Sequence, residues 1–135
     1  MPLPQCRSEY SMYIAGKKKI RTAVILWLTT ISYMGLIFYL SSRHHYTLPA
    51  FPDNFDKVVH MCAYIPLAYL LSLSMIWSGL RKYVFLVAFI FASIYGVTDE
   101  LHQAFVPGRD PAVGDVLADT LGAFLGSLGA SFRGT

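Results

Sequence analysis

Polar side chains, all but one of them capable of acid–base chemistry, recur four residues apart at three places in the chain. These pairs are Asp56 with His60, Asp99 with Gln103, and Asp115 with Asp119. Residues four apart share one face of an α-helix, so each pair forms a polar stripe if its segment is helical. If the three helices end at the same depth, the stripes can face one another and form a single site.

The residue types indicate what this site can do. His60 can act as a general acid or base, and we expect Asp56 to orient its imidazole. Arg109 can bind an anionic group through two parallel hydrogen bonds. Carboxylates can share protons or hold a divalent cation, and those available are Asp99, Glu100, Asp115 and Asp119. The sequence has no Gly-x-Ser-x-Gly motif, so an enzyme here would be a hydrolase or transferase that uses activated water.

The candidate residues fall into two groups. The predicted catalytic residues are His60, Asp99, Glu100, Asp115 and Asp119. The predicted ligand-binding residues are Asp56, Lys57, Tyr64, Gln103 and Arg109. The sequence leaves the cofactor unknown, with a divalent cation as the one expected possibility.

The segments that carry these residues are apolar enough to cross a membrane. Of 135 residues, 55% are hydrophobic and 14% are charged, whereas soluble domains are about 25% charged. Apolar blocks cover residues 22–40, 58–77, 83–98 and 113–132. A membrane-spanning helix needs about 20 residues. We therefore predict an all-α protein, a bundle of four transmembrane helices. No basic stripe alternates with aromatic residues, which excludes nucleic acid as a partner.

The third and fourth blocks determine how deep the acids lie. The third block is short, and extending it to about 20 residues reaches His102, which places Asp99 and Glu100 near headgroup depth. In the fourth block small residues recur every four positions, at Gly114, Ala118, Gly122, Gly126 and Ala130. This spacing is typical of membrane helices that approach closely. It predicts a packed central helix, with a soluble glycine-rich loop as the alternative.

The charges predict the orientation of the helices. Of 11 Lys and Arg residues, eight fall before the first block, between the second and third, or after the fourth. The positive-inside rule then places both termini in the cytoplasm. All four His and seven of the eight acids lie toward the opposite face. Residues 1–21 are expected to form a loose cytoplasmic tail before a membrane domain at 22–132. Cys62 is expected to be a small packing residue.

The motifs resemble those of the VanZ-like family of small bacterial membrane proteins. The resemblance lies in "FDKVVHMCAYIPLAYLL", in "DELHQAFVPGRDPAVGDVLADTLGAFLG" and in the Ser-Ser segment of "YLSSRHHYTLP". It covers roughly residues 22 to 130. Many members carry Asn where this chain has Asp119, which adds a carboxylate here.

The resemblance implies a role at the cell envelope, because the family's namesake is associated with low-level resistance to teicoplanin. We therefore expect a multi-pass protein of the inner (cytoplasmic) membrane, in contact with membrane lipids and with its polar site on the extracytoplasmic face. The expected ligand is a phosphorylated lipid carrier, a lipid-linked cell-wall precursor or an acylated glycopeptide antibiotic. Two alternatives remain: a structural or interaction protein whose polar cluster ties helix ends together, and a proton or ion conductor. Conduction is disfavoured because the middles of the helices show no charged path.

Overall fold

The computed structural model describes residues 4–43, 55–109 and 111–134. Within them the chain forms four helices and no strand: α1 (Pro4–Ser41), α2 (Phe55–Ser78), α3 (Val84–Gln103) and α4 (Val113–Gly134). Each helix contains a segment long and apolar enough to span a membrane, at Ser11–Ser41, Phe55–Ser78, Val84–Gln103 and Val113–Arg133. The predicted all-α, four-span architecture is confirmed.

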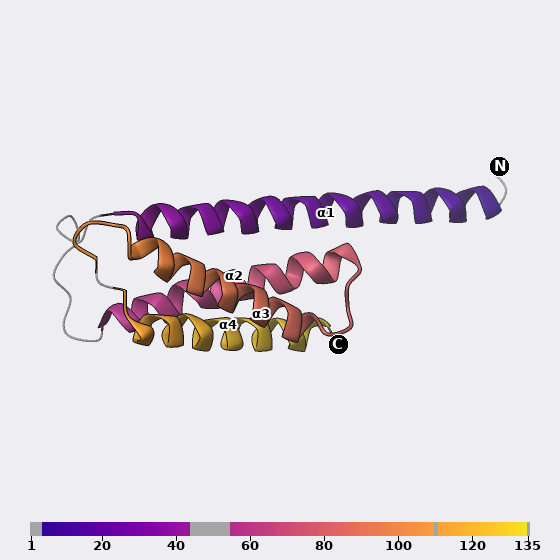
Figure 1. The fold of residues 1–135 in the computed structure, drawn as a ribbon. Coiled ribbons are helices and arrows are strands. Elements are labelled where there is room, and N and C mark those ends of the chain that lie inside the picture. Colours follow the sequence, from indigo (N-terminus) through magenta and orange to yellow (C-terminus); the bar gives the residue numbers. More distant parts are fainter. Residues whose placement is uncertain (1–3, 44–54, 110, 135) are drawn as a thin grey trace.

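The first helix is much longer than its apolar block. It runs unbroken for 38 residues from Pro4, which corresponds to about 57 Å at 1.5 Å per residue. The expectation that residues 4–21 form a loose tail is therefore wrong. Once the apolar segment has formed a helix, each added residue gains a hydrogen bond without a new nucleation cost. After Pro4 the segment contains no proline that would stop this propagation. Its N-terminal part extends beyond the other helices (Figure 1).

The helices α2 and α4 pack closely because α4 presents glycines to α2. A Cβ atom at Gly122 would collide with the carbonyl oxygen of Met61, and one at Gly126 with that of Ile65. The Ala68 Cβ lies only 3.1 Å from the position of a Cβ at Gly126. Side chains at these positions would force the helices apart. The small-residue stripe thus acts as a contact surface, as the spacing predicts.

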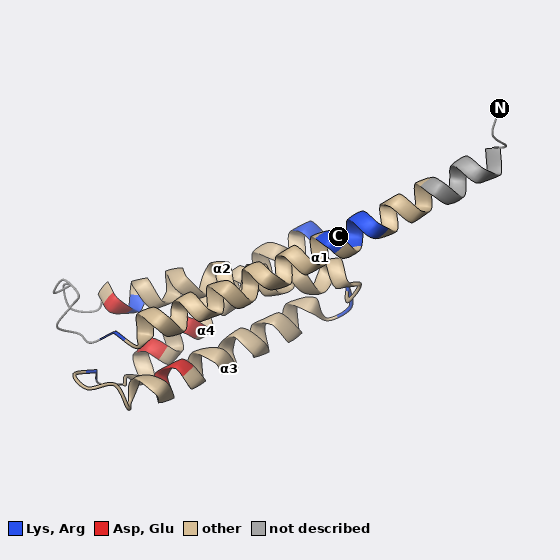
Figure 2. Ribbon diagram, turned by 90° about the horizontal axis from the view of Figure 1, so that it is seen from above, with Lys and Arg blue, Asp and Glu red and all other residues tan. Residues whose placement is uncertain are grey.

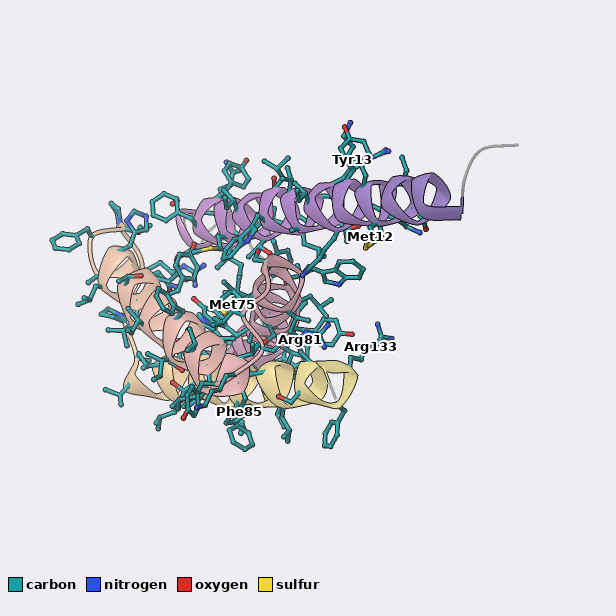
Figure 3. All side chains as sticks on the ribbon, turned by 90° about the vertical axis from the view of Figure 1, so that its right-hand side faces the viewer. Met12, Tyr13, Met75, Arg81, Phe85 and Arg133 are labelled. Atoms are coloured by element: carbon teal, nitrogen blue, oxygen red, sulfur yellow. The ribbon has the colours of Figure 1, made fainter. Side chains whose placement is uncertain are left out.

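The remaining helices complete the bundle around this pair. In Figure 1, α2, α3 and α4 lie together and α1 runs along one side. Figure 3 shows Met75 pointing among the helices, whereas Met12 and Tyr13 project from the part of α1 that extends beyond them. Cys62 is exposed on the surface of α2, so the expectation that it is a small packing residue is wrong. Successive side chains of a helix point in different directions, so Cys62 does not share the direction of Met61 or Ala63.

Hydrogen bonds attach α1 to α2 and α3 along its length. They join Trp27 to Ser78 (2.9 Å), Thr30 to Ser74 (3.0 Å), the Tyr33 hydroxyl to the Ala63 carbonyl (3.1 Å) and the Tyr95 hydroxyl to the Met34 carbonyl (2.7 Å). Lipid tails give helices no hydrophobic reason to associate, so such interhelical bonds and close packing hold a membrane bundle together. They fix α1 as one wall of the site described below.

We predict that Gly126→Ala destabilises the bundle by about 1–3 kcal/mol, the usual cost of overpacking, because its methyl group collides with the Ile65 carbonyl. The free energy of unfolding in detergent micelles measures this effect. Gly35→Ala is the matched control, since a Cβ at Gly35 has nothing within 4 Å. Equal stability of the two variants would contradict the close α2–α4 contact.

Candidate functional site

Three helix ends bring the predicted residues together at one end of the bundle. Figure 2 shows the acidic residues at the beginnings of α2 and α4 and near the end of α3, whereas most Lys and Arg lie toward the other end. The N-terminal end of α1 and the C-terminal end of α4 lie at that basic end. The site is therefore at the end opposite the termini, as the sequence predicts.

A histidine–aspartate pair between α2 and α4 forms the centre of the site. The Nδ1 of His60 lies 3.0 Å from Oδ1 of Asp119. Asp119 is fully buried. A Cβ at Gly96 of α3 would lie 2.9 Å from the Asp119 Cβ, so the glycine provides the room for this carboxylate. The partner of the imidazole is thus Asp119 from α4, and the expectation that Asp56 orients His60 is wrong.

Glu100 adds the third helix to this centre. Its Oε2 accepts a hydrogen bond from the backbone N–H of Ala112, at the start of α4 (3.2 Å). Its Oε1 lies 3.9 Å from the His60 Nδ1. One donor atom each from His60, Glu100 and Asp119 lies within 4.8 Å of the others. Imidazole nitrogen and carboxylate oxygen are common metal ligands, so these three side chains can hold a metal ion.

A second ionic cluster lies nearer the surface. Lys57 Nζ is 3.5 Å from Oδ1 of the buried Asp115 and 3.4 Å from Oδ2 of Asp56, whose side chain is 52% exposed. The Lys57 side chain lies against Gly114, where a Cβ would be 2.7 Å from its Cε. Asp56 and Asp115 therefore both pair with Lys57. Asp56 lies there because it is adjacent to Lys57 and points outward.

A cavity of about 310 Å³ lies between α1, α2 and α3, next to His60. One wall is apolar and consists of Ile37, Leu40, Val59 and Ala63. The polar lining residues are Ser41, Asp56, His60, Tyr64, Asp99, Gln103 and Arg109. The cavity thus combines an apolar wall with a polar end.

Several polar atoms at this end are buried without a partner. Asp99 accepts a hydrogen bond from Gln103 Nε2 through Oδ2 (3.2 Å), as their spacing predicts. The Tyr64 hydroxyl has no hydrogen-bond partner among the described residues, and the Asp99 Oδ1 forms no hydrogen bond of standard geometry there. The Ser41 hydroxyl lies beside the Asp99 carboxylate. A buried polar atom without a partner costs about 1–3 kcal/mol. The polar end of the cavity is therefore suited to a ligand that supplies the missing hydrogen bonds.

Two further polar residues near the end of α3, Arg109 and His102, form no ion pair with a carboxylate among the described residues. Gly108, with φ of 80°, turns the chain after α3 as the Pro-Gly sequence predicts. Arg109 then lines the cavity and donates from Nε to the Arg43 carbonyl (3.4 Å). Its guanidinium is therefore available for an anionic group, as the sequence predicts. His102 stacks on Phe38 of α1 and lies 2.9 Å from the Ser42 hydroxyl.

The family model VanZ/LLP1 matches residues 13–133, which include all the site residues above. The chain belongs to the VanZ/LLP1 family. Comparisons with curated proteins and with solved structures give no match. The resemblance of the sequence motifs to the VanZ-like family is thereby confirmed.

Sequence reasoning missed parts of the site in this VanZ/LLP1 protein. The side chains of Gly96 and of the cavity wall residues have no reactive or polar group, so their residue types do not indicate a functional site. A useful signal for Gly96 is its spacing of four after Ala88 and Ala92, which places three small residues on one face of α3 shortly before Asp99. Ser41 could be found from the Ser-Ser segment that the family shares. His44, His45, Asp53 and Asp110, which the charge pattern places on the same side, lie outside the described residues.

We predict that Lys57→Met destabilises the protein slightly because it leaves the Asp115 carboxylate buried without its ion pair. The cost is small because the side chain of Lys57 is 37% exposed. Asp115→Asn in the same chain should recover most of this loss, as measured by a double-mutant cycle of unfolding free energies. Asp56→Asn is the control and should recover little. The reverse ranking would contradict the assignment of Lys57 to Asp115.

Proposed function

We propose that this multi-pass VanZ/LLP1 protein binds a lipid-linked envelope ligand at the extracytoplasmic face of the cytoplasmic membrane. The observation that carries the proposal is the cavity with one apolar wall and a polar end whose buried atoms lack partners. A site of this composition suits an amphiphile. Candidate ligands are a phosphorylated lipid carrier, a lipid-linked cell-wall precursor and an acylated glycopeptide such as teicoplanin.

The size of the cavity supports binding of part of such a ligand. Small-molecule pockets occupy about 300–1,000 Å³, so about 310 Å³ accommodates a segment of hydrocarbon chain and the group attached to it. The hydrocarbon would contact Ile37, Leu40 and Val59. The rest of the chain would remain among the membrane lipids, which is a reason for this protein to bind its ligand from within the bilayer.

The polar end provides groups that recognise the head of the ligand. The hydroxyls of Ser41 and Tyr64 can donate to phosphate or carbonyl oxygens. The Oδ1 of Asp99 can accept from a sugar hydroxyl or an amide N–H. The guanidinium of Arg109 can bind a phosphate through two parallel hydrogen bonds. This combination suits a sugar phosphate or a peptide attached to a lipid.

A reaction at this end would be hydrolysis or group transfer by water. His60 lines the cavity, and the buried Asp119 carboxylate holds its Nδ1. A base oriented by a third group is the arrangement that activates nucleophiles in hydrolases. Asp119 takes the orienting role in this proposal, and His60 takes the role of acid or base.

A second candidate function is structural. The His60–Asp119, Lys57–Asp115 and Glu100–Ala112 contacts each connect two helices, which favours a cluster that only holds helix ends together. This alternative predicts that filling the cavity has no functional effect, since the contacts remain.

The test of ligand binding fills the cavity without touching its polar residues. We predict that Ala63→Leu reduces photocrosslinking to a diazirine-bearing polyisoprenyl phosphate in nanodiscs at least about tenfold, because the larger side chain occupies the cavity. Cys62→Leu is the matched control, since the adjacent Cys62 side chain is exposed on the outer surface. A parallel assay compares teicoplanin susceptibility of cells that express each variant. Wild-type behaviour of Ala63→Leu in both assays would support the structural alternative.

We further propose that both termini are cytoplasmic, because the basic residues gather at their end of the bundle (Figure 2). A phosphatase reporter, active only outside the cytoplasm, should be inactive at either terminus and active when inserted after Arg43. A fluorescent reporter that folds only in the cytoplasm should give the opposite pattern. Phosphatase activity at the termini would place the site on the cytoplasmic face and contradict the proposed ligand class.

A further inference from the structure

We infer that His60, Glu100 and Asp119 form a site for a divalent transition metal of the Zn²⁺ type. Each residue comes from a different helix, so a bound ion would join α2, α3 and α4 at one point. The inference goes beyond the binding of a lipid-linked ligand and stands without it. It rests on distances, on two oxygens without partners and on the balance of charge.

The distances fit a single ion. Zn–N and Zn–O bonds of about 2.0–2.2 Å place neighbouring ligand atoms roughly 3–3.5 Å apart. The His60 Nδ1 lies 3.0 Å from Asp119 Oδ1 and 3.9 Å from Glu100 Oε1. All three donor atoms lie within 4.8 Å of one another. Small rotations of the side chains are enough to close them around a metal.

Two buried oxygens in the cluster point to a missing partner. Glu100 is 4% exposed and Asp119 is fully buried. The Glu100 Oε1 and the Asp119 Oδ2 have no hydrogen-bond partner among the described residues. The other Glu100 oxygen accepts a hydrogen bond from the Ala112 N–H, and Glu100 directs Oε1 toward the imidazole. A metal ion bound to the unprotonated His60 Nδ1 would replace the contact between this nitrogen and the Asp119 Oδ1.

The charges around the cluster do not balance. Asp99, Glu100 and Asp119 are three buried carboxylates. Within the described residues, the ion pairs of Glu100 and Asp119 are with His60 alone, and Lys57 is paired with Asp56 and Asp115. Even a protonated His60 supplies only one positive charge. Uncompensated charge at membrane depth is costly, and a divalent cation bound by a neutral His60 offsets two of the three negative charges.

The ligand set indicates which metal is bound. A site of one imidazole and two carboxylates suits Zn²⁺ better than Mg²⁺, which prefers oxygen ligands and keeps several waters. Three protein ligands also leave a fourth position open, as in catalytic zinc sites. The donor atoms that lie within 4.8 Å of one another come from His60, Glu100 and Asp119, so neither Asp99 nor Asp115 belongs to the ligand set.

The test measures metal binding by the full chain in nanodiscs without any envelope ligand. After treatment with a chelator, we expect isothermal titration calorimetry to show one Zn²⁺ per chain. Glu100→Gln and His60→Asn should each weaken binding by more than about a hundredfold, the upper end of what loss of an outer-shell partner costs. The matched controls are Asp56→Asn, a half-exposed acid, and His102→Asn, a histidine packed on Phe38. Both should keep the wild-type affinity.

The wild-type protein decides the outcome even if a ligand variant fails to fold. Zn²⁺ should raise its unfolding temperature, and Co²⁺ should give the visible absorption of a site with a nitrogen ligand. Absence of both effects, of stoichiometric binding, or of any difference between ligand and control variants would overturn the inference. The Ala63→Leu variant separates the two proposals, because it should bind Zn²⁺ normally. Normal photocrosslinking by wild type without Zn²⁺ binding would reject the metal site alone.

Discussion

The close contact between α2 and α4 is the constraint on which the rest of the structure depends. Gly122 and Gly126 let the backbone of α4 lie against the carbonyls of Met61 and Ile65. Asp119 lies about one helical turn before Gly122 in α4. The same helix contact therefore places its Oδ1 3.0 Å from the Nδ1 of His60. Without the glycines the helices would separate, and a carboxylate at membrane depth would lose its partner. The packing surface and the polar centre are therefore parts of one interface.

The polar residues at this end of the bundle serve two purposes that their contacts distinguish. Lys57 forms an ion pair with Asp115, and His102 contacts Phe38 of α1 and the adjacent Ser42, so these residues hold helices in place. The Glu100 Oε1 and the Asp119 Oδ2 are buried in the same region without hydrogen-bond partners among the described residues. A membrane protein that needed polar residues only for packing gains nothing from unpartnered ones. Their position next to a cavity favours a binding role.

Much of the fold follows from the sequence because hydrophobic length is a local property. The four spans, the extension of α3 to the acids and the glycine face of α4 all appear in the apolar blocks and their spacing. The continuation of α1 to Pro4 does not appear in these patterns. The polar segment is helical because it extends the apolar helix that follows it in the chain. The exposure of Cys62 also depends on which face of α2 the other helices cover.

By itself, the sequence determined the family motifs, the number of spans and the gathering of acids and imidazole at one end of the bundle. It could do so because residue spacing along a helix sets which side chains share a face and depth. Only the tertiary structure decided the partners: Asp119 rather than Asp56 for His60, the backbone of Ala112 for Glu100, and Arg43 rather than a carboxylate for Arg109. The physical reason is that a partner on another helix depends on the rotation and separation of the helices. These are set by contacts such as Gly96 against Asp119, which join residues distant in the chain.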